Sequence, residues 1–340
     1  MSMLSLLQPS GTPFEMGKQL GVFGATAVHR HLIESSAWKR IVKWRGSETA
    51  HRMRTLVQRQ FPAINEEIEG LAQGLQLDTE DVFLWNCRGD LLALAPDGCT
   101  TVQIPSANGP RIAHNEDGDP GFRGHCGLGL FAPVNGPRFA SFVYPGSLPG
   151  HTFAVNAHGL AMTVNNLRAQ QIAAGMPRMV LTRALLDLDS LDAALALLRE
   201  TPRSGGFHLT LAQRGRMDLL SIEFDARAVS VRLLQQPALH ANHAIHADMR
   251  ERPQIITDSS RHRQQRGDTM LQSRDINPLA ILADQSDPLL PIYRDADNDP
   301  DDENTLATAD MHVGEDHVRW QVYGRPGTAP LYSLIDAQPA

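Results

Sequence analysis

The sequence has few cysteines and no long apolar run. Its 340 residues include three cysteines, Cys87, Cys99 and Cys126, too few for the disulfide framework typical of small secreted proteins. No apolar stretch approaches the roughly 20 residues that a membrane-spanning helix needs. The first residues also lack the basic segment of a secretion signal. We therefore expect a cytoplasmic protein with no membrane partner.

An excess of basic charge is also missing. The chain carries 31 basic and 38 acidic residues, a formal net charge of −7, which argues against nucleic acid as a partner because phosphate binding needs a basic surface. Apolar residues make up 42% of the chain and charged residues 20%, as in ordinary globular proteins. A chain of this length can bury a substantial core.

The first ninety residues read as helical and most of the remainder as strands. Ile64, Ile68 and Leu71 fall on one helix face, and Asp78 is the predicted N-cap of the next helix. Strands are predicted at 99–104, 111–114, 138–144, 152–156, 160–164, 208–213, 218–224, 228–234, 305–312 and 318–323. Helices are predicted at 179–188, after Ser190, and within 258–285. This order predicts an α+β fold, a four-layer α/β/β/α sandwich of two antiparallel sheets, in one domain spanning 1–340.

Cys99 differs from an ordinary strand cysteine, which is usually inert and buried, in what precedes it. A Pro-Asp-Gly turn at 96–98 delivers the chain to Cys99. Gly98 has no side chain to obstruct attack on its carbonyl. The Cys99 sulfur can attack that carbonyl, shift the acyl group from nitrogen to sulfur, and leave a thioester for water to hydrolyse. We expect cleavage between Gly98 and Cys99 into fragments 1–98 and 99–340, which stay associated.

Cleavage would give Cys99 a free α-amine. Such an amine has a pKa near ~7.7–8.0 and is partly a base at neutral pH. The thiol on the same residue has an unperturbed pKa of about 8.5. One residue then supplies both nucleophile and base, so we expect neither a metal nor another cofactor.

Several short motifs occur along the chain in a characteristic order. DGCTT at 97–101 is accompanied by GTPFEMG at 11–17, EEIEGLAQG at 66–74, NED at 115–117, GLAMTVN at 159–165, HANH at 240–243 and GRP at 324–326. Together they resemble the isopenicillin N acyltransferase family of N-terminal-nucleophile hydrolases over nearly the whole chain. The resemblance implies the four-layer sandwich, self-cleavage, and acyl transfer through a cysteine thioester.

The resemblance also implies roles for individual residues. Asp117 matches an acid that orients the nucleophile; without the family it would read as a turn aspartate. Asn242 matches an oxyanion donor, and Asn165 matches another asparagine near the nucleophile. Asn166 is an alternative to Asn165, because a one-residue shift exchanges the two faces of a strand. His114 and Glu116 are expected to bind substrate.

Other charged clusters are interpreted as structural. His240, His243 and His246 do not converge if they lie on a strand, and the loop 295–301 has Pro300 where a calcium loop needs glycine. Arg261, Arg263 and Arg266 are predicted to form a structural ion-pair helix rather than an anion site, although Ser260, Arg263 and Arg266 are similar to a pattern of the family. The stretch 301–304 is acidic where some family members carry an arginine, and Glu116 stands where the penicillin enzyme has an aromatic residue. Both departures argue against a penicillin substrate.

Three functions remain open from the sequence. The first is hydrolysis of a small linear amide, such as an acyl, aminoacyl or β-alanyl amine; the acidic surroundings favour a substrate bearing an amine. The second is transfer of an acyl group from a thioester such as acyl-CoA to an amine. The third is a small-molecule binding protein that never cleaves itself. The sequence is compatible with a homo-oligomer and names no particular substrate.

Overall fold

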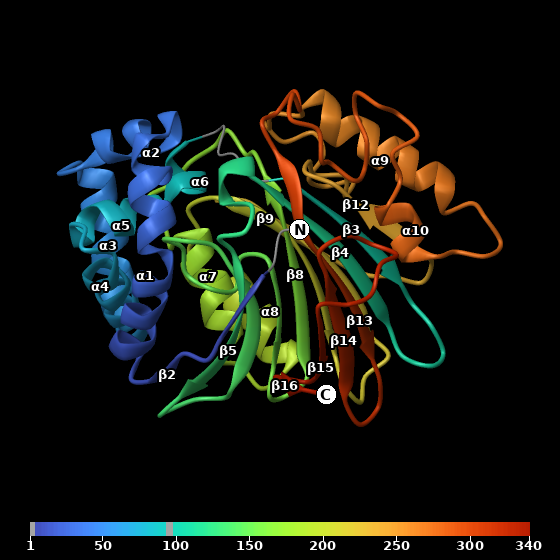
Figure 1. Ribbon diagram of the computed structural model, residues 1–340, viewed down its shortest axis with the longest axis horizontal. Coiled ribbons are helices and arrows are strands. Elements are labelled where there is room, and N and C mark those ends of the chain that lie inside the picture. The colour runs from blue at the N-terminus through green and yellow to red at the C-terminus, as the bar shows by residue number, and fades with distance from the viewer. Residues whose placement is uncertain (1–3, 93–97) are drawn as a thin grey trace.

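Two β-sheets stack face to face, and helices cover the outer side of each (Figure 1). The computed structural model describes residues 4–92 and 98–340, so Pro96 and Asp97 of the predicted turn lie outside the described residues. Among the described residues, no helix is both long enough and apolar enough to cross a membrane. The predicted α/β/β/α sandwich is confirmed.

The helices fall into an N-terminal group, α1 to α6, the pair α7 and α8, and the pair α9 and α10. The N-terminal group is α1 Pro13–Arg30, α2 Ser36–Ile41, α3 Glu48–Gln60, α4 Pro62–Leu75, α5 Thr79–Trp85 and α6 Arg88–Leu91, with short 3-10 turns at Leu32–Glu34 and Val42–Trp44. The others are α7 Arg178–Leu185, α8 Leu191–Glu200, α9 Asp258–Met270 and α10 Pro278–Leu282, with a further 3-10 turn at Pro120–Phe122. The predicted caps are confirmed: the side chains of Asp78 and Ser190 accept hydrogen bonds from the first turns of α5 and α8.

The larger sheet has nine strands. They are β1 Ser5–Leu7, β2 Ser10–Gly11, β5 Gly127–Pro133, β6 Phe139–Val143, β7 Phe153–Asn156, β8 Leu160–Leu167, β9 Gly206–Gln213, β10 Leu219–Phe224 and β11 Val229–Leu233. Strands β1 and β2 pair with β5 in parallel, and every other neighbour is antiparallel. Strand β5 was missed from the sequence because Gly127 and Gly129 weaken its apolar alternation.

The smaller sheet has seven strands, all antiparallel. In spatial order they are β12 Ala238–His240, β3 Gly98–Ile104, β4 Arg111–Gly118, β13 Asn304–Val313, β14 Val318–Tyr323, β15 Tyr332–Ile335 and β16 Gln338–Pro339. Strand β4 extends beyond the predicted end at residue 114, and this extension carries Glu116 and Asp117 into the sheet. Helices α9 and α10 pack on this sheet.

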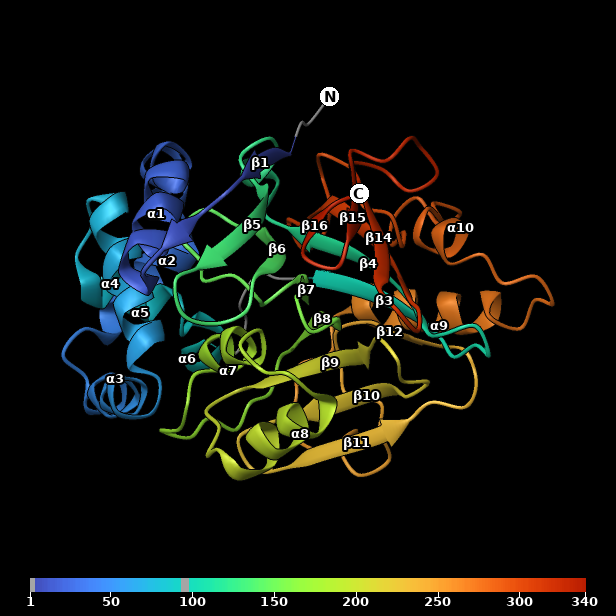
Figure 2. The same ribbon diagram turned by 90° about the horizontal axis from the view of Figure 1, so that it is seen from below.

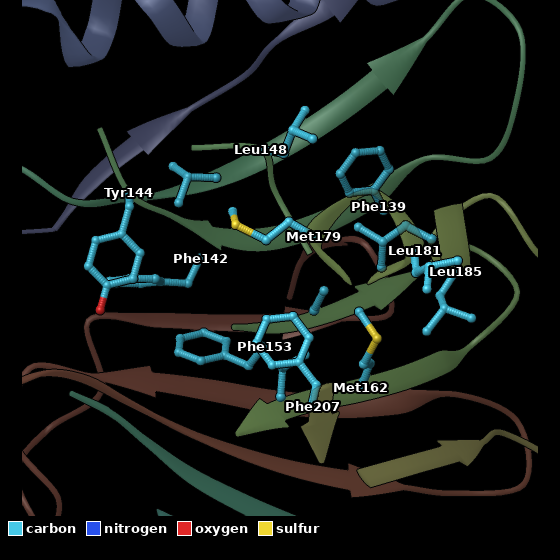
Figure 3. Close-up of a cluster of buried hydrophobic side chains, with 14 of the residues drawn as sticks. Phe139, Phe142, Tyr144, Leu148, Phe153, Met162, Met179, Leu181, Leu185 and Phe207 are labelled. Atoms are coloured by element: carbon cyan, nitrogen blue, oxygen red, sulfur yellow. The ribbon is translucent and has the colours of Figure 1, made fainter. Parts of the chain in front are cut away.

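The main hydrophobic core includes the nine-stranded sheet, its covering helices and one face of the seven-stranded sheet. Figure 3 shows Phe139, Phe142 and Phe153 of the nine-stranded sheet beside Met179 and Leu181 of α7. Burial of such large apolar side chains is the main stabilising contribution, at about 1.5–3 kcal/mol for each.

The register of β3 against β4 determines which residues meet. Cys99 pairs with Glu116, Thr101 with His114, and Gly98 with Asp117. Successive side chains of a strand alternate between faces, so the first two pairs share one face and the third lies on the other. The Cys99 face is directed towards β8, and the opposite face lies under α9 and α10 (Figures 1 and 2).

Candidate active site

The backbone of Cys99 is held on both sides. Its amide N–H donates to Oδ1 of Asn242 at 2.9 Å, and its carbonyl accepts from Nη1 of Arg263 at 2.6 Å. Nη2 of Arg263 also donates to Oδ1 of Asn242 at 2.7 Å. Because a guanidinium only donates, this contact fixes the Asn242 amide with its oxygen towards Cys99. The side-chain nitrogen of Asn242 donates to the carbonyl of Asn166, so Asn242 is an acceptor at Cys99 here, and its predicted role as the oxyanion donor stays a prediction.

Arg263 is the cation nearest to this backbone, and the sequence prediction for it was wrong. Arg261 and Arg266 do form ion pairs, with Asp258 and Asp284. Arg263 instead is fully buried and donates to Cys99, to Oγ1 of Thr100 at 2.8 Å, to Asn242 and to Ser259. Burial lowers the pKa of Arg263, and the neighbouring Arg294 lowers it further. A buried positive charge at this place stabilises a nearby thiolate.

The Cys99 thiol lies against a carboxylate in the gap between the sheets. Its Sγ is 3.6 Å from Oε2 of Glu116, and Nε2 of His114 is 3.1 Å from the same oxygen. The Tyr144 hydroxyl donates to Oε1 of Glu116 at 2.9 Å. In the intact chain Cys99 is 3% exposed, Glu116 2% and His114 0%. Of the two residues predicted to bind substrate, Glu116 contacts the thiol directly, and His114 contacts Glu116.

Burial lowers the pKa of His114 to about 3, which favours the neutral imidazole. The potential ligand atoms of Cys99, His114 and Glu116 lie within 4.8 Å of one another, a spacing that a metal ion could also bridge. The 3.1 and 3.6 Å contacts among them are hydrogen-bond distances, and we assign them as hydrogen bonds. The absence of a metal stays a prediction.

Asp117 lies on the other face of β4, away from the thiol. Its Oδ1 accepts from the Thr305 hydroxyl at 2.7 Å, and its buried Oδ2 has no hydrogen-bond partner among the described residues. Burial raises the pKa of Asp117, and Arg294 and Arg263 oppose that rise. Its predicted role in orienting the nucleophile stays a prediction.

A buried ion cluster surrounds Gly98 on this same face. Glu303 accepts from Arg294 at 2.5 Å and from Arg168 at 3.2 Å, and Nε of Arg294 donates to Asp299 at 2.9 Å. A Cβ atom on Gly98 would come within 2.1 Å of Oε2 of Glu303, so position 98 accommodates only glycine without a shift of the ion pair.

Sequence reasoning missed these arginines. The acidic stretch 301–304 does lack an arginine, but the fold supplies Arg294 and Arg168 from other segments. The calcium-like loop has the same explanation, because Asp299 in it pairs with Arg294. Arg168 lies 135 residues from Glu303 along the chain, whereas Arg294 is only five residues from Asp299 and nine from Glu303. In both cases the sequence shows charge without a motif.

The structure separates the two asparagines that the sequence could not distinguish. Oδ1 of Asn165 accepts from the Thr101 hydroxyl at 2.7 Å, which places Asn165 in the gap between the sheets. The Asn166 side chain accepts from Arg178 at 2.7 Å, while its backbone carbonyl accepts from Nδ2 of Asn242 at 3.2 Å. Asn165 is therefore linked to the thiol through Thr101, His114 and Glu116, and Asn166 is linked to the backbone nitrogen of Cys99 through Asn242.

The remaining cysteines and histidines have other environments. Cys87 and Cys126 are buried, and burial raises the pKa of both thiols. His240 contacts Glu223 at 2.9 Å, whereas His243 contacts Ser260 at 2.8 Å. The predicted divergence of these histidines is confirmed.

Two stacked sheets between two helical layers are the fold of the N-terminal-nucleophile hydrolases, and Cys99 lies near the start of β3, the second strand of the seven-stranded sheet. The family model for acyl-coenzyme A:6-aminopenicillanic acid acyl-transferase matches residues 106–325. The chain belongs to this family.

A curated relative gives a second comparison. The chain is 24% identical over 278 residues to the β-alanyl-dopamine/carcinine hydrolase of Drosophila melanogaster, covering 73% of this chain and 69% of the relative. The family and this relative together identify the chain as a hydrolase or acyltransferase that acts on amide or thioester bonds.

Proposed function

We propose that the chain is a precursor that cuts itself between Gly98 and Cys99, and that Cys99 is then the nucleophile of an amidohydrolase. The observation that carries this proposal is the setting of Cys99. Arg263 and Asn242 hold its backbone, a carboxylate lies beside its sulfur, and a side chain on the residue before it would displace the Glu303 carboxylate.

The backbone contacts suit an enzyme that keeps its new N-terminus in place. When the bond between Gly98 and Cys99 breaks, the Cys99 nitrogen becomes an amine and retains Oδ1 of Asn242 as an acceptor. The carbonyl of Cys99 remains held by Arg263. Preorganisation of this kind is worth a large part of a catalytic barrier, since a displacement of about 1 Å can cost roughly 10²-fold in rate.

The proposed self-cleavage also explains the position of Asp117. Its Oδ2 is buried without a hydrogen-bond partner among the described residues, which is costly for a carboxylate. Cleavage creates an ammonium one residue beyond Gly98, the strand partner of Asp117. A positive charge appearing there would offset the cost of burying the carboxylate.

The two fragments would remain together after the cut. Strand β1 of the first fragment pairs with β5 of the second, and apolar residues of α1 and α4 belong to the same buried core as those of β6 to β8. Separation would expose that core to water.

For the substrate, we propose an amide that releases a small amine and carries an amino group of its own. The relative from Drosophila melanogaster is described as acting on β-alanyl-dopamine and carcinine. Here the carboxylate of Glu116 contacts the thiol. A carboxylate beside the nucleophile favours a substrate that bears a positive charge.

A panel of amides tests this function. Purified enzyme should release primary amine from β-alanyl and aminoacyl amides faster than from acetyl amides of the same amines. Cys99→Ala should release none. A preference for acetyl amides would contradict the amine-bearing substrate while leaving the nucleophile assignment intact.

The family description supports a second candidate, acyl transfer from a thioester to an amine. The same acyl-enzyme serves both reactions, and the acceptor decides between them. An acyl-CoA that is consumed in proportion to an added amine, with formation of the new amide, would establish the transferase. An intact 340-residue chain without activity would favour the binding protein.

A further inference from the structure

We propose that the Glu116–His114 pair is the proton acceptor of the Cys99 thiol in the uncut chain. The inference rests on the proposed self-cleavage and assigns a step that the α-amine cannot perform. In the precursor the Cys99 nitrogen is an amide and has no basic lone pair. Self-cleavage nevertheless needs a thiolate, so another group must take the proton.

The positions of the hydrogens around His114 follow from its neighbours. Nδ2 of Asn165 donates to the carbonyl of His240 at 3.0 Å, which leaves Oδ1 of Asn165 as the acceptor for the Thr101 hydroxyl at 2.7 Å. The single hydrogen of Thr101 is thereby used. The 2.8 Å contact between Thr101 and Nδ1 of His114 then needs the hydrogen of Nδ1, and His114 donates there.

This assignment places one proton between His114 and Glu116. A neutral imidazole that carries its hydrogen on Nδ1 presents a lone pair at Nε2. That lone pair is 3.1 Å from Oε2 of Glu116, an oxygen that repels it unless a proton lies between them. Because burial lowers the pKa of His114 to about 3 and disfavours the imidazolium, the pair exists as a carboxylic acid that donates to the neutral imidazole.

Oε2 of Glu116 is also the oxygen that faces the thiol, at 3.6 Å. As the thiol proton moves to Oε2, the shared proton moves fully onto Nε2, and the pair holds both protons while Cys99 becomes a thiolate. The thiolate attacks the carbonyl carbon of Gly98. When the carbon–nitrogen bond breaks, the pair returns one proton to the Cys99 nitrogen, and a thioester remains for water to hydrolyse. The protons and electron pairs balance without a further reactant.

Among the described residues, the titratable or charged side chains that face the pair from the packed elements include Cys99 of β3, Tyr144 after β6, Cys126 before β5, His208 of β9 and, across Cys99, Arg263 of α9. Burial raises the pKa of Cys126 and lowers that of His208, so both stay neutral near pH 7. Arg263 stabilises the thiolate that the transfer produces.

The test measures the rate of self-cleavage of freshly synthesised chain in a cell-free system, using denaturing gels. Glu116→Gln keeps the shape of the side chain and can still donate to Nε2 of His114, but it cannot accept the thiol proton. At pH 7 cutting should be about 10²-fold slower than in the wild type, within the range for loss of a general base. The rate should recover towards that of the wild type as the pH rises past the unperturbed thiol pKa of about 8.5.

A matched control is Glu223→Gln, which alters another buried Glu–His pair, at 2.9 Å from His240, away from the thiol. This control should cut at nearly the wild-type rate at pH 7. Wild-type cutting by Glu116→Gln at pH 7 would overturn the inference, as would slow cutting at every pH. Cutting that depends on added zinc and stops with a chelator would also overturn it.

Hydroxylamine distinguishes the first step from the second, because it cleaves thioesters without help. It should not restore cutting of Glu116→Gln at pH 7; restoration would assign Glu116 to thioester hydrolysis and overturn the inference. The proposed function fails in a different way, if the wild type stays whole or Cys99→Ala is cut.

Discussion

Acidic side chains lie on both faces of the β3–β4 ladder, but their neighbours differ in kind. On the face towards β8, Glu116 contacts a thiol, an imidazole and a phenol, all groups that exchange protons. On the face under α9 and α10, Glu303 is held by two guanidiniums, which do not exchange protons near neutral pH. The side chains around Glu116 can transfer protons, whereas the arginines around Glu303 keep their charge and fix the geometry of that face.

This difference indicates how one short stretch of strand can be both reactive and rigid. The ion cluster fills the space beside Gly98, while the thiol of the next residue turns into the gap between the sheets. Alternation of side chains along the strand separates the two tasks by one residue. Substitutions on each face separate the two contributions.

The largest effect is expected from Cys99→Ala. Without the sulfur there is no nucleophile on the proton-exchanging face, so both self-cleavage and amide hydrolysis should fall to background. Gel analysis and amine release measure the two losses. Retained hydrolysis by this variant would show that another residue performs the chemistry.

Asn242→Ala should be next in size. It removes the acceptor that holds the Cys99 nitrogen at 2.9 Å, and kcat should fall about 10²-fold because the nucleophile loses its position. KM should change little. A variant that keeps kcat and loses affinity would reassign Asn242 to substrate binding.

Gly98→Ala disturbs the rigid face alone. Its Cβ would come within 2.1 Å of Glu303, and overpacking of this kind costs about 1–3 kcal/mol, so cutting should slow roughly tenfold. Residue 98 belongs to the other fragment after the cut. The hydrolysis rate per cut molecule should therefore match that of the wild type, whereas a lower rate would indicate a lasting distortion of the site.

Thiol labelling compares Cys99 of the proton-exchanging face with the two other cysteines without a mutation. Substoichiometric iodoacetamide near pH 7 should modify Cys99 of the cut enzyme, with activity lost in proportion, because thiolate fraction and access set the rate. Burial raises the pKa of Cys87 and Cys126, so peptide mapping should find them unmodified. Inactivation that follows labelling of either one would mean that the nucleophile is misassigned.

The smallest effect concerns Asp117. Its pKa is raised from the usual 3.8 by burial, so the folded state favours the protonated acid, and stability is lost as the pH rises through the raised pKa. Asp117→Asn, made in the Cys99→Ala background, should raise Tm at neutral pH by on the order of 2 °C. The difference should vanish at a pH below the usual value, and a lower Tm at neutral pH would contradict this assignment.

Local sequence patterns predicted the parts of the fold that depend on local physics. The caps at Asp78 and Ser190 and the alternation of β3 follow from neighbouring residues, and the structure confirms them. The family resemblance implied that Glu116 and His114 lie near substrate, but their contact with the thiol needed the register of β3 against β4.

The parts missed depend on contacts between distant segments. Arg168 meets Glu303 from 135 residues away, and Arg263 reaches the carbonyl of Cys99 from a helix 164 residues away. The run Arg261, Arg263 and Arg266 was predicted to form an ion-pair helix, and the sequence could not show that Arg263 alone turns inward to Cys99. Such pairings are fixed by the packing of α9 on the sheet and leave no signature within one segment.

The most direct measurement of the central claim is the mass of the purified chain under denaturing conditions, followed with time after synthesis. The account predicts that the intact chain disappears as two fragments, 1–98 and 99–340, appear together, the second beginning with an unblocked Cys99. A wild-type chain that stays whole while it hydrolyses amides, or a cut at any other bond, would contradict it.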